Sequence, residues 1–464
     1  MKTYRHYDPD QSYLLPPNLR EWLPEGHLAL FIGDVVDTLD LSAIREVYEA
    51  GDGRGQPPYH PGMMVKLLMY AYCTGKPSSR KIEKETWENV AYRVLSADQH
   101  PDHDSIAAFR ERHLKALAGL FLQVLRLCQE AGLVKLGHVA LDGTKVKANA
   151  SKHKAMSYER MGEAEKRLQE EVEALLAHAA AVDKAEDELY GKGKTGDELP
   201  EELRNRKSRL KKIREAKAAL EAQAKARAEE QAVEAKERLE ERARQEAQSG
   251  KKFGGKPPKV EDTAQAQPEP KAQRNFTDPE SRIMKDGTGF EQAYNAQAVV
   301  DAHAQVIVAT AVTQETNDKR QLVAMMKEAT LNVGKPQKAS ADAGYFSAEA
   351  VTDEALSGIV LYVPPERQKH GQTLQAEEAS PGGSVSVADR MRQVLRTPEG
   401  KDTYRMRKAI VEPVFGQIKE ARGFRRFSFR GLRKVSQEWN LVCLTHNLLK
   451  LFRSGWSPAL VSTG

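Results

Sequence analysis

A long segment in the middle of the chain sets the strongest limit on how this sequence folds. Residues 201–250 contain 25 charged side chains, eleven alanines and no aromatic residue. Alanine and long charged side chains favour helices, but this composition offers little apolar surface for a helix to bury. We therefore expect a long charged helix or helix pair outside the main core, which has to form from the parts of the chain on either side.

This charged segment is the centre of an insertion that we predict over residues 153–273. Gly and Pro in "GKTGDELPEE" (193–202) favour a hairpin between two helical arms. The stretch "GGKPPKVEDTAQAQPEPKAQ" (254–273) has the Pro, Gly and polar content of a flexible linker. The insertion therefore separates two pieces of one domain.

Length and composition exclude several classes of protein. At 464 residues the chain is long enough for two or three domains, and its net charge of +5 at pH 7 is modest. Cys73, Cys128 and Cys443 lie far apart without a Cys-x-x-Cys pair, which argues against a disulfide framework and a cysteine zinc site. With no signal peptide and no apolar run of about 18 residues, we expect a cytoplasmic protein without a membrane partner.

Residues 1–133 are predicted to form a helical domain, because apolar residues recur there at helical spacing, as in "MMVKLLMYAYC" (63–73). The stretch "TGKPSSRKIEKE" (74–85) ends one helix at Gly75 and starts another at Ser78 or Ser79, which is compatible with a DNA-binding helix-turn-helix. Three basic residues would then lie on the outer face of the second helix, where they contact either DNA or only solvent: Arg80, Lys81 and Lys84.

Residues 134–152 and 274–434 are predicted to form an α/β domain with a mixed sheet, and residues 435–464 a C-terminal helix and tail. A strand ends near Asp142, before the insertion, and the remaining elements follow it. They are two β-rich runs in residues 294–315, a helix over 317–334, a strand ending at 342, a strand over 358–365 and a helical region over 404–424.

Three acids occupy corresponding positions on these elements. Asp142 lies on the first strand, Asp342 follows the fourth strand, and Glu412 lies on the helix after the fifth. Each has a simpler explanation: the two aspartates precede or enter turns, and Glu412 is four residues from Lys408, a helical ion-pair spacing. Crowded carboxylates are tolerated mainly when divalent cations neutralise them, and Mg²⁺ prefers such hard oxygen ligands. The sequence therefore predicts that the three acids hold Mg²⁺.

Several separate blocks resemble the DDE transposases of bacterial insertion sequences, and together they cover nearly the whole chain. They are "YDPDQSYLLPPNLREWLPEGHLA" (7–29), "PPYHPGMMVKLLMYAYCTGKPSSRKIE" (57–83), "NFTDPESRIMK" (275–285), "DAGYFS" (342–347) and "IVEPVFGQIKEARGFRRF" (410–427). The resemblance implies a ribonuclease-H-like core in which Asp142, Asp342 and Glu412 are catalytic and bind two Mg²⁺ ions, with Mn²⁺ as an alternative. Residues before and after Glu412 resemble the Tyr-Arg-Glu-Lys group of the family.

In that group Tyr404 and Lys419 match directly, whereas the arginine position is open between Arg407 and Lys408. The usual spacing has three residues between the cation and the glutamate, which fits Lys408, but only Arg407 is an arginine. The insertion also stands after the first strand, whereas relatives carry theirs before the last catalytic helix.

Positive charge near the C-terminus suits a polyanionic partner. Residues 401–434 hold eleven Lys and Arg against three acids. We expect Arg422, Arg425 and Arg426 to contact DNA, together with the cations of the Tyr-Arg-Glu-Lys group. Three phenylalanines are interleaved with them, and we assign these to the core in preference to base stacking: Phe424, Phe427 and Phe429.

These features together predict a transposase that binds the terminal inverted repeats of its element, cuts there and transfers the strand to target DNA. Double-stranded DNA is the expected partner, and a homodimer is expected when two ends are paired. The insertion is then expected to contact DNA or a second copy of the chain, or else to be a solvated spacer. The alternatives are a catalytically inactive DNA-binding scaffold and a metal-dependent nuclease without strand transfer.

Overall fold

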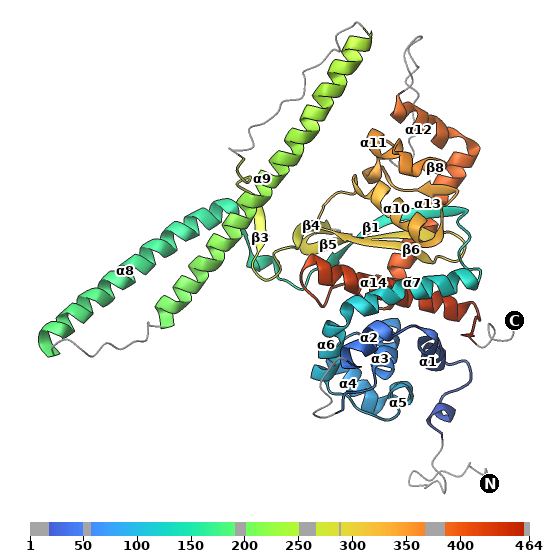
Figure 1. Cartoon of the computed structure of the whole chain (residues 1–464), viewed down its shortest axis with the longest axis horizontal. Coiled ribbons are helices and arrows are strands. Elements are labelled where there is room, and N and C mark those ends of the chain that lie inside the picture. The colour runs from blue at the N-terminus through green and yellow to red at the C-terminus, as the bar shows by residue number, and fades with distance from the viewer. Residues whose placement is uncertain are drawn as a thin grey trace, which may run out of the picture. The chain divides into compact units, whose positions relative to one another are not determined.

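The structure is a computed structural model of the chain, and it describes residues 18–49, 57–190, 201–249, 266–286, 289–366 and 386–458. The chain forms two compact units (Figure 1). The first consists of residues 1–147 and 294–464, and the second of residues 148–293. The N-terminal helices and the sheet thus belong to one unit, although the sequence suggested a domain boundary near residue 133.

The predicted helical N-terminal region is confirmed. Its helices have apolar faces that are almost fully buried, and α3 is buried along nearly all of its length. They are α1 (Leu28–Thr38), α2 (Ser42–Glu49), α3 (Pro61–Cys73), α4 (Ser79–Glu88), α5 (Val90–Ser96), α6 (His103–Arg112) and α7 (Leu114–Glu130), preceded by a 3₁₀ turn at Leu19–Trp22.

A mixed sheet forms the centre of the first unit, as predicted. Its strands are β1 (His138–Lys147), β5 (Gly289–Asp301), β6 (Ile307–Thr313), β7 (Lys338–Ser340) and β8 (Val360–Tyr362). Their spatial order is β6-β5-β1-β7-β8. Strand β5 runs antiparallel to β6, whereas β7 is parallel to both β1 and β8. Strands β5 and β6 are buried along most of their length, whereas the second half of β1 is mostly polar and half-buried.

Helices connect and cover these strands. They are α10 (Gln321–Val333), α11 (Ala348–Val351), α12 (Val387–Arg396), α13 (Pro398–Gly416), a π-helical segment (Gln417–Ala421) and α14 (Leu432–Arg453). Helix α13 packs on β1, and α14 packs on both α7 and β6. Figure 1 shows α7 and α14 between the sheet and the other N-terminal helices. The sequence predicted an amphipathic last helix, but α14 is buried on several sides because it has partners in both layers.

The second unit contains the predicted charged helices, α8 (Tyr158–Tyr190) and α9 (Glu201–Ser249). They pack on each other through a small apolar cluster: Met161, Leu168, Leu210, Ile213, Ala216 and Leu220. The helix pair therefore has a modest core of its own. Residues 193–200 of the predicted turn and 254–265 of the predicted linker lie outside the described residues.

Short strands close the base of this unit. Strand β2 (Ala155–Ser157) pairs antiparallel with β3 (Gln273–Asn275), and the Tyr158 amide donates to the Ala272 carbonyl at 2.8 Å. Strand β4 (Arg282–Asp286) pairs antiparallel with the first residues of β5. The insertion therefore leaves and re-enters at neighbouring points. No helix in the described ranges is both long and apolar enough to cross a membrane.

Candidate active site

Asp142 and Asp342 lie at the same level of two neighbouring parallel strands. The register of β1 and β7 pairs Ala140 with Ser340, so each aspartate stands two residues beyond a paired position. Parallel strands end at the same edge of a sheet, which is where α/β proteins place their sites. The two carboxylates interact electrostatically, and the negative charge of Asp342 raises the pKa of Asp142.

The Asp142 carboxylate is held from two sides. Its Oδ1 accepts the Gly143 amide at 2.8 Å, and its Oδ2 accepts Nη1 of Arg407 at 2.8 Å. Burial raises the pKa of Asp142 to about 6, and the charge of Asp342 adds to this, whereas Arg407 lowers it. Asp142 is thus a partly desolvated acid that a cation stabilises in its charged form.

Asp342 serves as the cap of a short 3₁₀ turn. Its Oδ1 accepts the Gly344 amide at 2.8 Å, and its carbonyl accepts the Tyr345 amide at 3.2 Å. The turn chemistry expected of Asp-Ala-Gly is therefore present, and the same turn places the carboxylate beside Asp142.

Of the two candidates for the arginine position of the Tyr-Arg-Glu-Lys group, Arg407 forms an ion pair with Asp142, whereas Lys408 is exposed. Its side chain is buried, and its guanidinium lies 5.8 Å from the Tyr404 ring. Burial lowers the pKa of Arg407, but the charges of Asp142 and Asp342 and the Tyr404 side chain outweigh this and raise it overall. Arg407 is therefore a permanent positive charge at Asp142.

Glu412 is not gathered with the two aspartates. It is exposed on α13, between Arg407 and Lys419, both of which contact β1. In the described ranges no ion pair joins Glu412 to Lys408, and no three Asp, Glu, His or Cys side chains lie close enough together to hold a metal ion. The acids predicted from sequence thus form a pair, with the third on the adjacent helix.

The basic residues of the C-terminal region differ in exposure. Lys419 is half-buried, and its Nζ donates to Thr144 Oγ1 at 3.2 Å and to the Lys145 carbonyl at 3.0 Å. Arg425 and Arg426 are exposed on a loop that hydrogen-bonds with the end of β1 at Lys147. An exposed basic loop therefore continues from the strand that carries Asp142.

The prediction that Arg422 contacts DNA needs correction. Its side chain is buried, and Nη1 donates to Thr445 Oγ1 at 2.8 Å and to the Val442 carbonyl at 3.3 Å. Burial lowers its pKa. Arg422 ties the loop to α14 and offers no surface to a phosphate. Phe424 and Phe427 are buried in an edge-to-face contact, as expected for core residues, and Phe429 lies under Arg110.

Two parts of the chain match known families. Residues 17–112 match "Transposase domain (DUF772)", and residues 366–452 match "Transposase DDE domain". The two matches support an insertion-sequence DDE transposase. No curated protein and no solved structure matches it significantly. The second match includes Arg407, Glu412 and Lys419 of the transposase, whereas Asp142 and Asp342 lie outside both matched regions.

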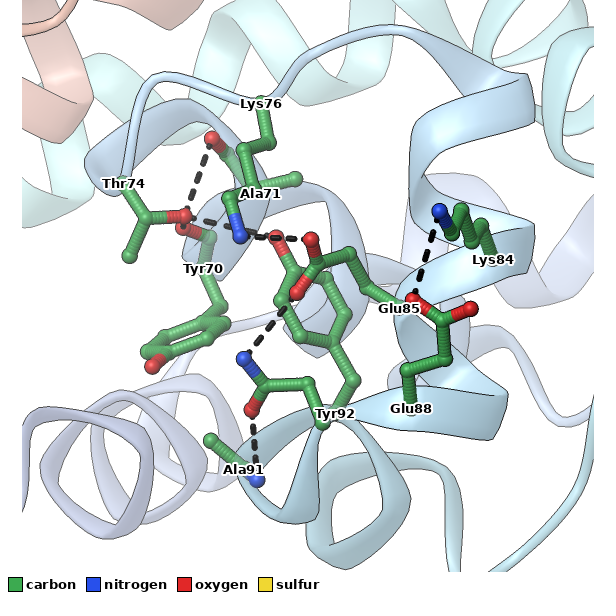
Figure 2. A network of polar contacts seen from close by, with 10 residues as sticks. Tyr70, Ala71, Thr74, Lys76, Lys84, Glu85, Glu88, Ala91 and Tyr92 are labelled. Atoms are coloured by element: carbon green, nitrogen blue, oxygen red, sulfur yellow. Dashed lines mark hydrogen bonds and ion pairs between the residues drawn. The ribbon is translucent and has the colours of Figure 1, made fainter.

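The first matched region of the transposase contains the predicted helix-turn-helix (Figure 2). Helix α4 begins after Ser78, as predicted, and a polar network fixes it to its neighbours. Glu85 accepts from Lys76 in the turn and from Asn89 at 3.0 Å, while Thr74 contacts the Tyr92 hydroxyl at 3.3 Å. The three basic residues of α4 named above are exposed, in agreement with the sequence.

Gly75 attaches this turn to the rest of the unit. Its φ is +74°, and a Cβ there would lie 2.6 Å from the Arg422 carbonyl oxygen. Only glycine fits both the backbone angle and this close approach. The helix-turn-helix is therefore packed directly on the loop that follows the π-helical segment.

Sequence reasoning missed a group of polar residues beside the acid pair of the transposase. Asp318 follows β6, and its Oδ1 accepts from Asn295 and Gln297 of β5 at 2.7 Å each. Burial lowers the pKa of Lys145, and the negative charges of Asp318, Asp142 and Asp342 partly offset this lowering. The available signal was two polar residues, Asn295 and Gln297, among the small and apolar residues of 293–300.

Proposed function

We propose that this transposase cuts DNA at the ends of its element and joins the freed 3′ end to target DNA. The observation that carries this is the pair formed by Asp142 and Asp342 on neighbouring parallel strands, beside an exposed basic loop. A buried carboxyl with a raised pKa beside a second acid, as at Asp142, is more typical of functional sites than of structural ones.

A ribonuclease-H-like core is part of this proposal. The strand order β6-β5-β1-β7-β8, with β6 antiparallel to β5 and with β7 parallel to both β1 and β8, supports it. In this arrangement the first strand occupies the middle of the sheet and the fourth lies next to it. That is why acids 200 residues apart in sequence become neighbours.

The donor chemistry of the acid pair fits a divalent cation. Asp142 and Asp342 supply hard oxygen atoms, and Arg407 already occupies Asp142 Oδ2 as a positive charge. We assign Asp142 and Asp342 to hold Mg²⁺ or Mn²⁺, with Glu412 joining from α13. Two such ions, when bound, activate the attacking oxygen and stabilise the leaving oxygen in phosphoryl transfer.

The transposase's own residues have distinct parts in the reaction that we propose. Arg425 and Arg426 attract the DNA backbone next to the end of β1, because their guanidinium groups are exposed. Arg407 and Tyr404 lie on the side of α13 near Asp142, where they orient the phosphate that enters the site. Lys419 fixes the π-helical segment after α13 to β1 through Thr144 and Lys145.

Single substitutions test the assignment of the acids. We expect Asp142→Asn, Asp342→Asn and Glu412→Gln each to reduce Mg²⁺-dependent cleavage of labelled DNA that carries an inverted-repeat end. Binding of the same DNA in a mobility-shift assay should change little, because phosphate contacts come from cations elsewhere. Glu46→Gln, which alters an exposed acid on α2, is the matched control.

The same assay separates the candidate functions. Products joined to target DNA support a transposase, whereas cut ends that are never joined indicate a nuclease alone. DNA binding without cleavage in either cation indicates a scaffold. Near-wild-type cleavage by any one acid variant removes that residue from the site.

A further inference from the structure

The two faces of β1 have different surroundings at the acid pair. Side chains of a strand alternate between its faces. Asp142 and Thr144 both contact residues of α13 and its π-helical extension. A side chain at Gly143, between them, would therefore point to the opposite side of the sheet, where polar side chains lie.

Two buried side-chain amides pack against Gly143 on that side. A Cβ at Gly143 would lie 2.9 Å from Asn295 Oδ1 and still closer to Gln297 Nε2. Both side chains are fully buried and come from β5, the hydrogen-bonded neighbour of β1. The backbone of β1 next to Asp142 therefore rests directly on these amides, and glycine is required for that contact.

Asp318 holds both amides in place. Its Oδ1 accepts Nδ2 of Asn295 and Nε2 of Gln297, each at 2.7 Å. Hydrogen bonds to an ionised acceptor are about twice as strong as neutral ones, and a buried donor left unpaired costs about 1–3 kcal/mol. Asn295 Oδ1 has no donor in the described part of the chain, and Asn295 Nδ2 also donates to the Glu315 carbonyl at 3.2 Å. The amide orientation therefore depends on the segment of Asp318 and Glu315 rather than on β1.

The same network reaches Asp342 through Tyr345. The buried Tyr345 hydroxyl donates to Gln297 Oε1, and the Tyr345 amide donates to the Asp342 carbonyl. A Cβ at Gly344 would lie 2.9 Å from Asp342 Oδ1 and 3.8 Å from Asp318 Oδ2. One chain of contacts thus links the strand that carries Asp142 with the turn that carries Asp342.

We propose that Asp318 is a positioning residue that sets the separation of Asp142 and Asp342 through Asn295, Gln297 and Tyr345. Cation binding needs both carboxylates at a fixed spacing, and residues behind metal ligands commonly change affinity on the order of 10–100-fold when they are removed. This inference rests on the proposed function only in naming the acid pair as the cation site.

The test compares two substitutions at Asp318 in the full-length chain. Asp318→Ala removes the acceptor, whereas Asp318→Asn removes the charge but keeps an oxygen at Oδ1. Binding of Mn²⁺ alone, without DNA, is measured by electron paramagnetic resonance titration. We expect Asp318→Ala to weaken Mn²⁺ binding on the order of 10–100-fold and Asp318→Asn to retain most of the affinity.

Tyr345→Phe provides a second, milder change because it deletes one hydroxyl from a fully buried ring. We expect it to weaken Mn²⁺ binding in the same direction as Asp318→Ala. Tyr92→Phe is the matched control, since it deletes a buried hydroxyl that contacts Thr74 in the N-terminal helices. Thermal melts of each variant show whether the fold is retained.

The outcomes are distinct. Wild-type affinity in Asp318→Ala overturns the proposal, and so does an Asp318→Asn variant as weak as Asp318→Ala in a folded protein, because the charge is then required directly. A wild-type chain that binds no Mn²⁺ overturns both this proposal and the cation site. Mn²⁺ binding with the expected variant pattern but no DNA cleavage overturns the proposed function alone.

Discussion

At the scale of single residues, the ion pair between Asp142 and Arg407 is the main electrostatic feature of the site. Its two side chains are 22% and 8% exposed, so little water screens the 2.8 Å contact. Burial alone raises the pKa of Asp142, and Arg407 opposes that rise. The ionisation of Asp142 is therefore a direct measure of how strongly Arg407 engages it.

We expect the Asp142 carboxyl of the metal-free protein to titrate near pH 6, and Arg407→Gln to raise its pKa further because an opposing positive charge is lost. Since a pKa of about 6 lies above the ordinary 3.8, the contribution of Asp142 to the free energy of unfolding falls as pH rises from about 4 to about 6. Carbon-detected NMR of the labelled carboxyl measures this pKa. Lys408→Gln, which alters the exposed neighbour, should leave it unchanged.

The sequence singled out Asp142 and Asp342 and left the arginine position open between Arg407 and Lys408. It did not distinguish Arg422 from Arg425 and Arg426. Burial of Arg422 depends on Thr445 and Val442, which come some 20 residues later on α14. Asp318 was overlooked for a similar reason, since the amides that donate to its carboxylate lie on another strand. Spacing along the chain predicts neighbours on one element, whereas these contacts join different elements.

At the scale of elements, the order of strands and helices was predictable, and so were the long charged helices. Periodicity and Gly or Pro breaks carry that information locally. The small core between α8 and α9 was not anticipated, because its members are spread thinly along two charged helices. The division of the chain into compact units also differs from the predicted domains, because α14 packs on both α7 and β6 and joins the N-terminal helices to the sheet.

We expect the helix pair to be removable. Replacing residues 159–271 by a short Gly-Ser linker joins Tyr158 to Ala272, which are already hydrogen-bonded at 2.8 Å. The melting temperature of the first unit should change little, and the helical circular dichroism signal should fall. If the insertion clamps DNA or a second copy, the variant should fail to pair two element ends. Full paired-end cleavage by the deletion variant contradicts that role.

At the scale of the whole molecule, the net charge is small, and the distribution of the charged residues matters more than their sum. The net charge is only +5, and Arg407 and Arg422, within the most basic region, are buried with partners of their own. In the proposed function, attraction to DNA therefore depends on exposed cations. Among these, Arg426 and Arg425, which pairs with the exposed Glu420, lie next to the end of β1.

Replacing Arg425 and Arg426 together by Ala should weaken DNA binding for all sequences alike. Each lost phosphate contact lowers the slope of log affinity against log salt concentration by about 0.9, so we expect a loss of about 1.8 in a fluorescence-anisotropy titration. Lys115→Ala with Arg126→Ala removes the same charge from exposed positions on α7 and serves as the control. An equal change in both variants contradicts a specific role for the loop.

The packing of α14 against α7 also has a consequence for how the chain is made. Helix α7 ends at Glu130, and its partner begins at Leu432, roughly 300 residues later. At about 5–20 residues per second, a ribosome needs roughly 15–60 s to synthesise that interval. During this time the side of α7 that α14 will cover, including Cys128, whose Sγ donates to the Asn447 carbonyl, has no partner. Newly synthesised chains, and any chain truncated before α14, are therefore expected to depend on chaperones.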